Sequence, residues 1–326
     1  MTRTTEAPAI TRSDIAVARS RIAADVRHTP LMRLRGSDLG IDCAELWLKL
    51  EHLQAGGSFK ARGMFNRMRS NPVPEAGVVI ASGGNAGIAV AVAAKAMGVR
   101  CEVFVPETTS AAKRARLDEL GAVLVVGGAS YAEALAASLE RQAATGALLM
   151  HAYDQREVVI GAGTLAAEVE DDAGVPDRIL VSVGGGGLIA GIAAWFEDRC
   201  AIDALEPERA PTLYRAREAG KPVDVDVAGI AADSLGARRV GAIAWELAQQ
   251  YVTGAWLLAD ADIRAAQEAM WSGLRLAVEP AAALPLAALA TRTVAPRRHE
   301  RVLLVICGAN LDLASLATPP RPSPTS

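Results

Sequence analysis

The sequence has few cysteines, few lysines and almost no excess charge of either sign. Four cysteines are scattered through 326 residues without close pairing. This disfavours a disulfide framework and a cysteine-based zinc site and indicates reduced thiols, as in the cytoplasm. The 34 basic and 37 acidic residues leave a formal net charge of −3. We therefore expect no nucleic-acid partner and no membrane partner.

We also expect neither a targeting segment nor a membrane segment. Residues 1–12 are polar and contain no apolar core of a secretory signal. Residues 179–196 are long and uncharged enough to imitate a membrane span, but Gly184–Gly187 interrupt them in the middle. We predict a strand, a turn and a helix there.

Short runs rich in Val, Ile and Leu alternate with Ala-rich segments of helical length, which predicts an α/β fold of two open, mostly parallel sheets. With 51% hydrophobic residues, the chain can bury large cores in two domains. The expected strands of the first sheet are residues 78–81, 101–105, 123–126 and 148–150, and those of the second are 179–183, 201–205, 255–258 and 302–306. The segment Glu45–Leu50 is expected to return to the second sheet.

The order of these segments predicts a small domain inserted into a larger one. The large domain is expected to comprise residues 1–76 and 148–316, and the small domain residues 77–147. Residues 317–326 hold four prolines and no apolar periodicity, so we predict a disordered tail without a catalytic role.

Only five lysines occur, against 29 arginines, so each can be considered in turn. Lys60 ends the run Gly56-Gly57-Ser58-Phe59-Lys60, a flexible turn before a helix start with Ser58 as a possible N-cap. A helix N-terminus and an aromatic ring would lower the pKa of this amine toward neutrality, which suits Schiff-base chemistry. The alternative is an ordinary surface lysine. The others are interpreted as an edge-strand charge, Lys49, and as solvated residues, Lys95, Lys113 and Lys221.

Three glycine-rich turns follow expected strands, at the sheet edge where open α/β folds bind ligands. Ser82–Gly87 opens a helix and would offer backbone N–H groups to a carboxylate, or is simply a turn capped by Ser82 or Asn85. Gly184–Gly187 carries a high entropic cost, so close approach of a phosphate is the favoured reason for it. Cys307–Asn310 is the third turn.

A dinucleotide site is a competing hypothesis for the second turn. Gly185–Ala190 satisfies G-x-G-x-x-A, and Glu206 follows 21 residues after Gly185, where a ribose-binding acid would stand. This hypothesis leaves the Lys60 and Asn85 turns without a function. Otherwise Glu206 is interpreted as a solvated loop acid.

Taken together, these segments resemble the serine/threonine dehydratases, pyridoxal-phosphate enzymes of the tryptophan synthase β-subunit group (fold type II). Leu50–Gln54 and Gly57–Gly63 look like the cofactor-lysine segment of that family, and Ser82–Gly87 looks like its substrate-carboxylate loop. Gly184–Gly191 is similar to its phosphate cradle. Ala231–Gly236, Val278–Pro280 and Cys307–Gly308 are further similarities.

The resemblance implies a cofactor, pyridoxal 5'-phosphate, in the cleft between the two domains. Lys60 would bind it as a Schiff base and take the α-proton of the substrate. No metal is expected. The implied cofactor-binding residues are Phe59, Lys60, Asn85, Gly184, Gly185, Gly186, Gly187, Leu188 and Cys307. The implied substrate-binding residues are Ser82, Gly83, Gly84, Asn85 and Ala86.

The implied reaction is elimination from a small hydroxy-amino acid. A neutral thiol at Cys307, facing the pyridine nitrogen, would restrain the electron sink and favour loss of the β-substituent, so that L-threonine or L-serine gives the 2-oxo acid and ammonia. Alternatives are a lyase for 3-hydroxyaspartate-type substrates, a β-replacement enzyme, or a dinucleotide-binding sensor without enzymatic activity. Relatives are commonly dimers or tetramers, which implies a homo-oligomer.

Departures from the family pattern refine these expectations. Gly83 stands where related racemases carry a serine, which disfavours racemisation. Glu206 and the Ala210 carbonyl resemble part of a divalent-cation site, but Thr212 replaces an expected acidic ligand, and one carboxylate makes a weak cation site. The chain ends soon after the third turn, so we expect no regulation by isoleucine.

Overall fold

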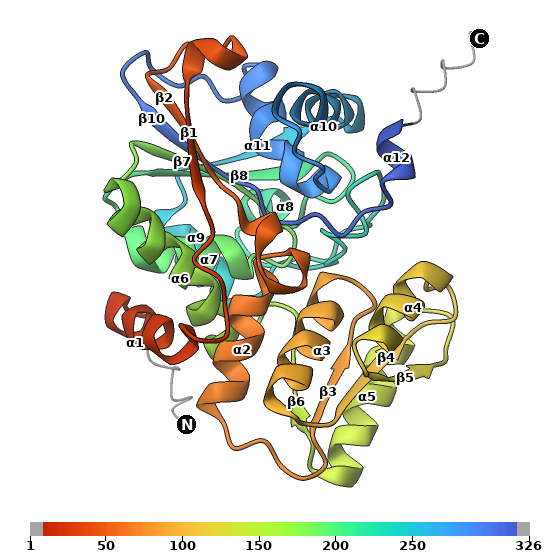
Figure 1. Cartoon of the computed structure of the whole chain (residues 1–326). Coiled ribbons are helices and arrows are strands. Elements are labelled where there is room, and N and C mark those ends of the chain that lie inside the picture. The colour runs from red at the N-terminus through yellow and green to blue at the C-terminus, as the bar shows by residue number, and fades with distance from the viewer. Residues whose placement is uncertain (1–8, 318–326) are drawn as a thin grey trace, which may run out of the picture.

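A computed structural model of the chain describes residues 9–317. Its larger sheet has six strands in the order β1-β2-β10-β7-β8-β9, all pairs parallel except β1 with β2 (Figure 1). The strands are β1 (Leu31–Arg35), β2 (Glu45–Lys49), β7 (Arg178–Ser182), β8 (Ala201–Pro207), β9 (Gly254–Leu258) and β10 (Arg301–Val305). Strand β2 pairs with β10, so the N-terminal segment returns to this sheet.

The smaller sheet has four parallel strands in the order β5-β4-β3-β6. They are β3 (Val78–Ala81), β4 (Cys101–Val105), β5 (Val123–Val126) and β6 (Leu148–Leu149). The predicted fold class, α/β with two open and mostly parallel sheets, is therefore confirmed. Because β6 pairs with β3, the small sheet extends two residues past position 147.

Helices cover both faces of both sheets. On the large sheet, α10 (Asp260–Leu274) and α11 (Pro280–Ala290) lie on one side, and α6 (Arg156–Ala173), α7 (Gly187–Phe196) and α9 (Ala242–Tyr251) on the other (Figure 1). On the small sheet, α3 (Asn85–Met97) and α4 (Ala111–Glu119) pack opposite α5 (Tyr131–Thr145). The remaining elements are α1 (Arg12–Ile22), η1 (Gly36–Leu39), η2 (Glu51–Leu53), η3 (Ala55–Gly57), α2 (Lys60–Ser70), α8 (Thr212–Ala219) and α12 (Ala314–Ala317).

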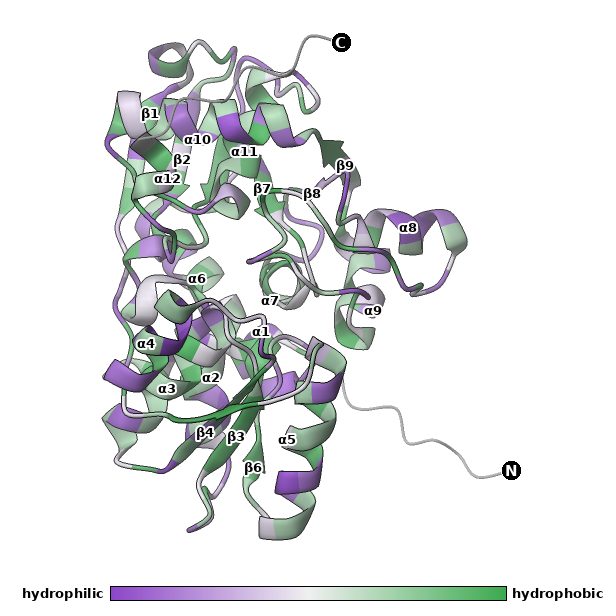
Figure 2. Ribbon diagram, turned by 90° about the vertical axis from the view of Figure 1, so that its right-hand side faces the viewer, coloured by the Kyte–Doolittle hydropathy of each residue, from purple (hydrophilic) through white to green (hydrophobic). Residues whose placement is uncertain are grey.

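The cores follow from the apolar strands. Ile179, Leu180 and Val181 of β7 are fully buried, as expected for a central parallel strand covered on both faces. Figure 2 shows the same hydrophobic colouring along β3 and β4 of the small sheet. Residues 179–196 form β7, a turn and α7, as predicted. Within the described part of the chain, no helix combines the length and apolar character that a membrane span requires.

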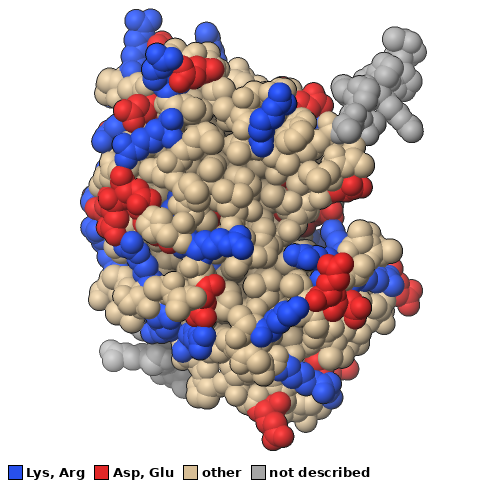
Figure 3. Space-filling view, viewed as in Figure 1, with Lys and Arg blue, Asp and Glu red and all other residues tan. Residues whose placement is uncertain are grey.

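The charged surface in Figure 3 mixes acidic and basic side chains over the visible face, without a broad field of one sign. The predicted tail at 317–326 lies outside the described residues, apart from Ala317 at the end of α12.

One lysine prediction is wrong. Strand β2 lies between β1 and β10, so Lys49 is not on an edge strand. Its side chain is fully buried and forms an ion pair with Glu168 of α6, with 2.7 Å between Nζ and Oε2. The alternation of Lys49 with leucines was misleading because its partner is 119 residues away in the chain.

Candidate active site

One cavity collects the residues that follow three strands. The ends of β7 and β10 lie side by side in the large sheet, and the loop after β3 faces them from the small sheet. The lining residues are Phe59, Lys60, Asn85, Ser182, Gly184–Leu188, Ser234, Leu235, Glu279, Ala281 and Cys307. Of the residues predicted for the site, Ser82, Gly83, Gly84 and Ala86 are not in this lining and form the adjoining loop.

Lys60 is the first residue of α2 and presents its amine to this cavity. The Nζ donates a hydrogen bond to the Ala152 carbonyl at 2.8 Å and lies 4.9 Å from the centroid of the Phe59 ring. Burial lowers the pKa of Lys60 to about 8, although the nearby Cys307 and Glu279 oppose the shift. The direction is the predicted one, and burial is its largest cause.

Ser58 does not cap α2, contrary to the prediction. The N-cap is Phe59, while Ser58 is extended (φ −161°, ψ 160°) and forms a β-bridge with Gly308. This bridge holds the Lys60 segment against the turn after β10, through Phe59 N–H to the Cys307 carbonyl and Ala309 N–H to the Gly57 carbonyl. The Ser58 hydroxyl is buried and has no hydrogen-bond partner among residues 9–317.

The glycine turn after β7 leaves backbone donors free. Within the described residues, the N–H groups of Gly184, Gly185 and Gly186 have no acceptor, although Gly184 and Gly186 are buried. Gly186 has a positive φ of 87°, and α7 begins at the next residue. Free N–H groups before a helix N-terminus form an anion site that suits a group with several oxygens.

Packing gives a second reason for these glycines, which the sequence argument missed. A Cβ at Gly185 would lie 2.3 Å from the Tyr153 ring, and one at Gly186 would lie 2.5 Å from Ala244 Cβ. The turn is therefore glycine-rich partly because Tyr153 and α9 press against its outer side.

Asn85 is held by a carboxylate that sequence reasoning did not identify as part of the site. Its Nδ2 lies 2.9 and 3.0 Å from the two oxygens of Glu279, and its Oδ1 accepts from Asn310 Nδ2 at 2.7 Å. Glu279 also accepts from the Ser234 hydroxyl and from Asn310 N–H. Burial raises the pKa of Glu279, and these donors oppose the shift. The only sequence signal was the similarity of Val278–Pro280 to the family.

Cys307 lines the same cavity and follows β10 and the buried Ile306 directly in the chain. Burial raises the pKa of its thiol above the ordinary value, and the neighbouring Glu279 adds to the effect. The thiol is therefore neutral at physiological pH, as the predicted chemistry requires.

The loop Ser82–Ala86 begins α3 without the side-chain cap that the alternative interpretation of this turn expects. The N-cap is Gly84, and the Ser82 hydroxyl instead accepts from Gly84 N–H at 3.3 Å. A Cβ at Gly83 would lie 3.0 Å from Cγ2 of Thr109. Thr109 therefore occupies the space that a larger residue at position 83 would need.

Both interpretations of Glu206 are wrong. Its side chain is fully buried at the end of β8 and accepts hydrogen bonds from the N–H groups of Leu213 and Tyr214, and its Oε1 lies 2.9 Å from the Thr212 hydroxyl oxygen. Burial raises its pKa to about 7. A carboxylate engaged in this way cannot bind a ribose, so the dinucleotide hypothesis has no ribose-binding acid at Glu206. In the part of the chain that the structure covers, no cluster of three potential metal ligands occurs.

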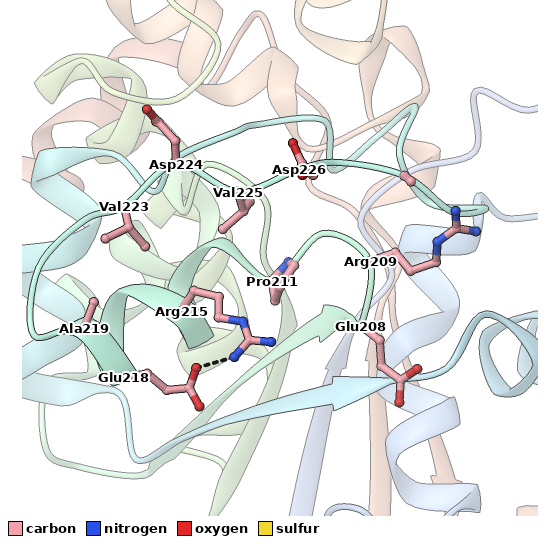
Figure 4. A pocket seen from close by; sticks show the side chains of 11 residues that line it. Glu208, Arg209, Pro211, Arg215, Glu218, Ala219, Val223, Asp224, Val225 and Asp226 are labelled. Carbon is pink, nitrogen blue, oxygen red and sulfur yellow. Dashed lines mark hydrogen bonds and ion pairs between the residues drawn. The ribbon is translucent and has the colours of Figure 1, made fainter.

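A second cavity lies beside α8 (Figure 4) and contains no comparable chemistry. Its side chains come from α8 and from the segments on either side of it. Several charged ones form ion pairs: Arg215 with Glu218, Asp224 with Arg239, and Arg209 with Asp260. The candidate active site is therefore the cavity at the strand ends.

Comparisons with known proteins agree with this geometry. A family model described as pyridoxal-phosphate dependent enzyme matches residues 22–308. The L-threonine ammonia-lyase of Geobacter sulfurreducens is 34% identical over 310 residues, 93% of this chain and 76% of that protein. The phenylserine dehydratase of Ralstonia pickettii is 33% identical, covering 94% of both chains. The structure of maize serine racemase superposes with a TM-score of 0.89 at 29% identity, covering 95% of this chain and 96% of that one.

Proposed function

This chain belongs to the family of pyridoxal-phosphate dependent enzymes, and from that premise we propose that it is a dehydratase, an ammonia-lyase that converts L-threonine, L-serine or both to the 2-oxo acid and ammonia. The two relatives are named for ammonia-lyase activity on L-threonine and for dehydration of phenylserine. Both names specify a β-hydroxy amino acid, which supports this substrate class for the present chain.

The residues of the cavity fit pyridoxal phosphate. The free N–H groups of Gly184–Gly186 match a phosphate, and the amine of Lys60 matches the aldehyde. Phe59 and Cys307 line the space between them, where the ring would lie. Buried donors without acceptors are costly in a folded protein, so the glycine turn itself supports a bound anion.

The chain's own residues then have distinct tasks. When bound, the cofactor supplies an electron sink for the charge that develops at Cα. Lys60 Nζ, whose pKa is lowered to about 8, anchors the aldehyde carbon and later accepts the proton from Cα. The N–H groups of the Ser82–Ala86 loop, other than that of Gly84, which donates to the Ser82 hydroxyl, would bind the substrate carboxylate. A neutral Cys307 thiol beside the ring nitrogen could not keep that nitrogen protonated as a carboxylate would, and this would favour loss of the β-hydroxyl over transamination.

A single observation carries this proposal: Lys60, the glycine turn and Cys307 line one cavity although they come from segments more than 100 residues apart. The test is a panel of L-serine, L-threonine, 3-hydroxyaspartate and phenylserine, assayed for ammonia and 2-oxo acid with purified protein and cofactor. Lys60→Ala should abolish turnover while the circular dichroism spectrum stays unchanged. Ammonia release by this variant would refute the assignment of Lys60.

Two other reactions are separable in the same assays. Added thiol should not divert the product, whereas a β-replacement enzyme would incorporate it. D-serine should not accumulate from L-serine, because Gly83 has no side chain that could move a proton and Thr109 fills the space beside it. A homo-oligomeric state remains a prediction of this proposal. So does a cytoplasmic location, which is favoured by the scattered cysteines.

A further inference from the structure

A buried chain of polar groups connects Glu206 to the glycine turn. Thr212 Oγ1 lies 2.5 Å from the Gly184 carbonyl oxygen and 2.9 Å from Glu206 Oε1. Both Thr212 and Glu206 are fully buried. Thr212 and Glu206 do not line the active-site cavity, and none of the chemistry proposed above uses them.

Glu206 determines where Thr212 stands. Thr212 begins α8, and the N-cap before it is Pro211, which has no side-chain oxygen to accept from the first turn. The Glu206 carboxylate takes that role from the neighbouring strand end, at 2.8 Å from Leu213 N and 2.7 Å from Tyr214 N. The helix start is thereby attached to β8, and the Thr212 hydroxyl is held against the glycine turn.

The contact with Gly184 fixes the orientation of a peptide group. In a trans peptide the carbonyl and the following N–H point in opposite directions. Because Thr212 holds the Gly184 carbonyl on one side, the Gly185 N–H must point to the other. Gly185 lines the active-site cavity, and this N–H has no acceptor within residues 9–317.

We propose that Thr212 is a positioning residue for cofactor phosphate binding: its hydroxyl holds the Gly184–Gly185 peptide so that the Gly185 N–H faces the phosphate. The inference rests on the proposed site, in which the glycine turn binds that phosphate. A peptide without this hydrogen bond can rotate, because glycine on both sides imposes little restriction on the backbone. Thr212 therefore supplies a rigidity that the glycine turn lacks.

The test compares two ligands on the apoprotein, pyridoxal 5'-phosphate and pyridoxal, which differ only in the phosphate. Thr212→Val keeps the shape and removes the hydroxyl. It should weaken pyridoxal 5'-phosphate binding about tenfold, the value of one hydrogen bond to a charged site, and change pyridoxal binding less than about twofold. Thr212→Ser should restore the wild-type affinity. Absorbance titration measures both dissociation constants.

Ser138→Ala is the control, because Ser138 is also buried and donates to a backbone carbonyl, that of Leu135, at 2.7 Å, away from the cavity. It should leave both affinities unchanged. If Thr212→Val does not fold, Thr212→Cys, with a weaker donor, should show the same selective loss at a smaller size. If Thr212→Val weakens the binding of both ligands equally, or of neither, the inference about Thr212 is wrong, while the proposed function is unaffected. A wild-type protein that binds no pyridoxal 5'-phosphate overturns the proposed function as well.

Discussion

Lys60 differs from the other lysines because its amine is buried beside a cavity, and this lowers its pKa to about 8. Only the neutral amine attacks an aldehyde, so the rate of reductive methylation of Lys60 in the apoprotein should rise about tenfold per pH unit below this pKa and level off above about pH 8. Peptide mass spectrometry measures the labelling. A rise that continues to about pH 10, near the ordinary lysine value of 10.5, would contradict the burial argument.

Glu279 acts on the same amine through its charge. Its carboxylate opposes the lowering of the Lys60 pKa, so Glu279→Gln should move the labelling midpoint of Lys60 to lower pH. The Ser234 hydroxyl can reverse and accept from the new amide, but Asn85 Nδ2 keeps only its contact with Oε1. We therefore expect a loss of about 1–3 kcal/mol of unfolding free energy. Glu246→Gln, an exposed change in α9, is the control. An unchanged midpoint would show that Glu279 is neutral beside Lys60.

At the scale of elements, α2 is fastened by a buried group of charges. Arg62 donates to both carboxylate oxygens of Glu51 and to both of Glu168, at 2.7–2.8 Å. Lys49 adds a third contact to Glu168. Burial alone would raise the pKa of Glu168, but the hydrogen bonds and charges of Arg62 and Lys49 lower it below the ordinary 4.5. The stabilisation from Glu168 is therefore present above about pH 4.5 and is lost as the pH falls below it.

Removing Arg62 should lower the unfolding free energy, because its buried carboxylate partners lose their charge compensation. Arg62→Met leaves two buried carboxylates with one lysine and should lower the unfolding free energy by about 3–5 kcal/mol. Arg215→Met, which breaks a half-exposed pair with Glu218 on α8, should cost less than about 1 kcal/mol. Urea unfolding at pH 7 measures both variants. Similar losses in the two would mean that the buried group does not stabilise α2.

The elements differ in how far the sequence could predict them. Apolar strands such as β7 and the glycine turns after them depend on local patterns, so their places and their meeting at one sheet edge could be predicted. Lys49, Ser58, Glu206 and Glu279 could not be, because distant partners decide their surroundings. Asn85 and Glu279, for example, are 194 residues apart. The neighbouring residues in the sequence do not distinguish a charged side chain that is buried and paired through tertiary contacts from one that is exposed.

At the scale of the whole molecule, residues from the large-sheet and small-sheet parts of the chain line the active-site cavity, and an ion pair joins these two parts near it. Lys113 of α4, expected to be solvated, lies with its Nζ 2.8 Å from Oδ1 of Asp233, in the segment that also carries Ser234. The Asp233 carbonyl also approaches Gly84 of the Ser82–Ala86 loop. Both contacts of Asp233 link the small-sheet side of the site to the large-sheet side.

Breaking this pair should change substrate binding more than stability. The two side chains are 31% and 79% exposed, so Lys113→Met should alter the unfolding free energy by less than about 1 kcal/mol. It should raise the KM for the hydroxy-amino acid by about two- to fivefold, with little change in kcat, because the small-sheet side of the site would no longer be held to the segment that carries Ser234. Salt screens exposed pairs, so added salt should raise the wild-type KM toward that of the variant and leave the variant unaffected. Lys95→Met is the control. Asp233→Asn should add nothing to Lys113→Met, and additive effects of the two would show that the ion pair does not link the two sides of the site.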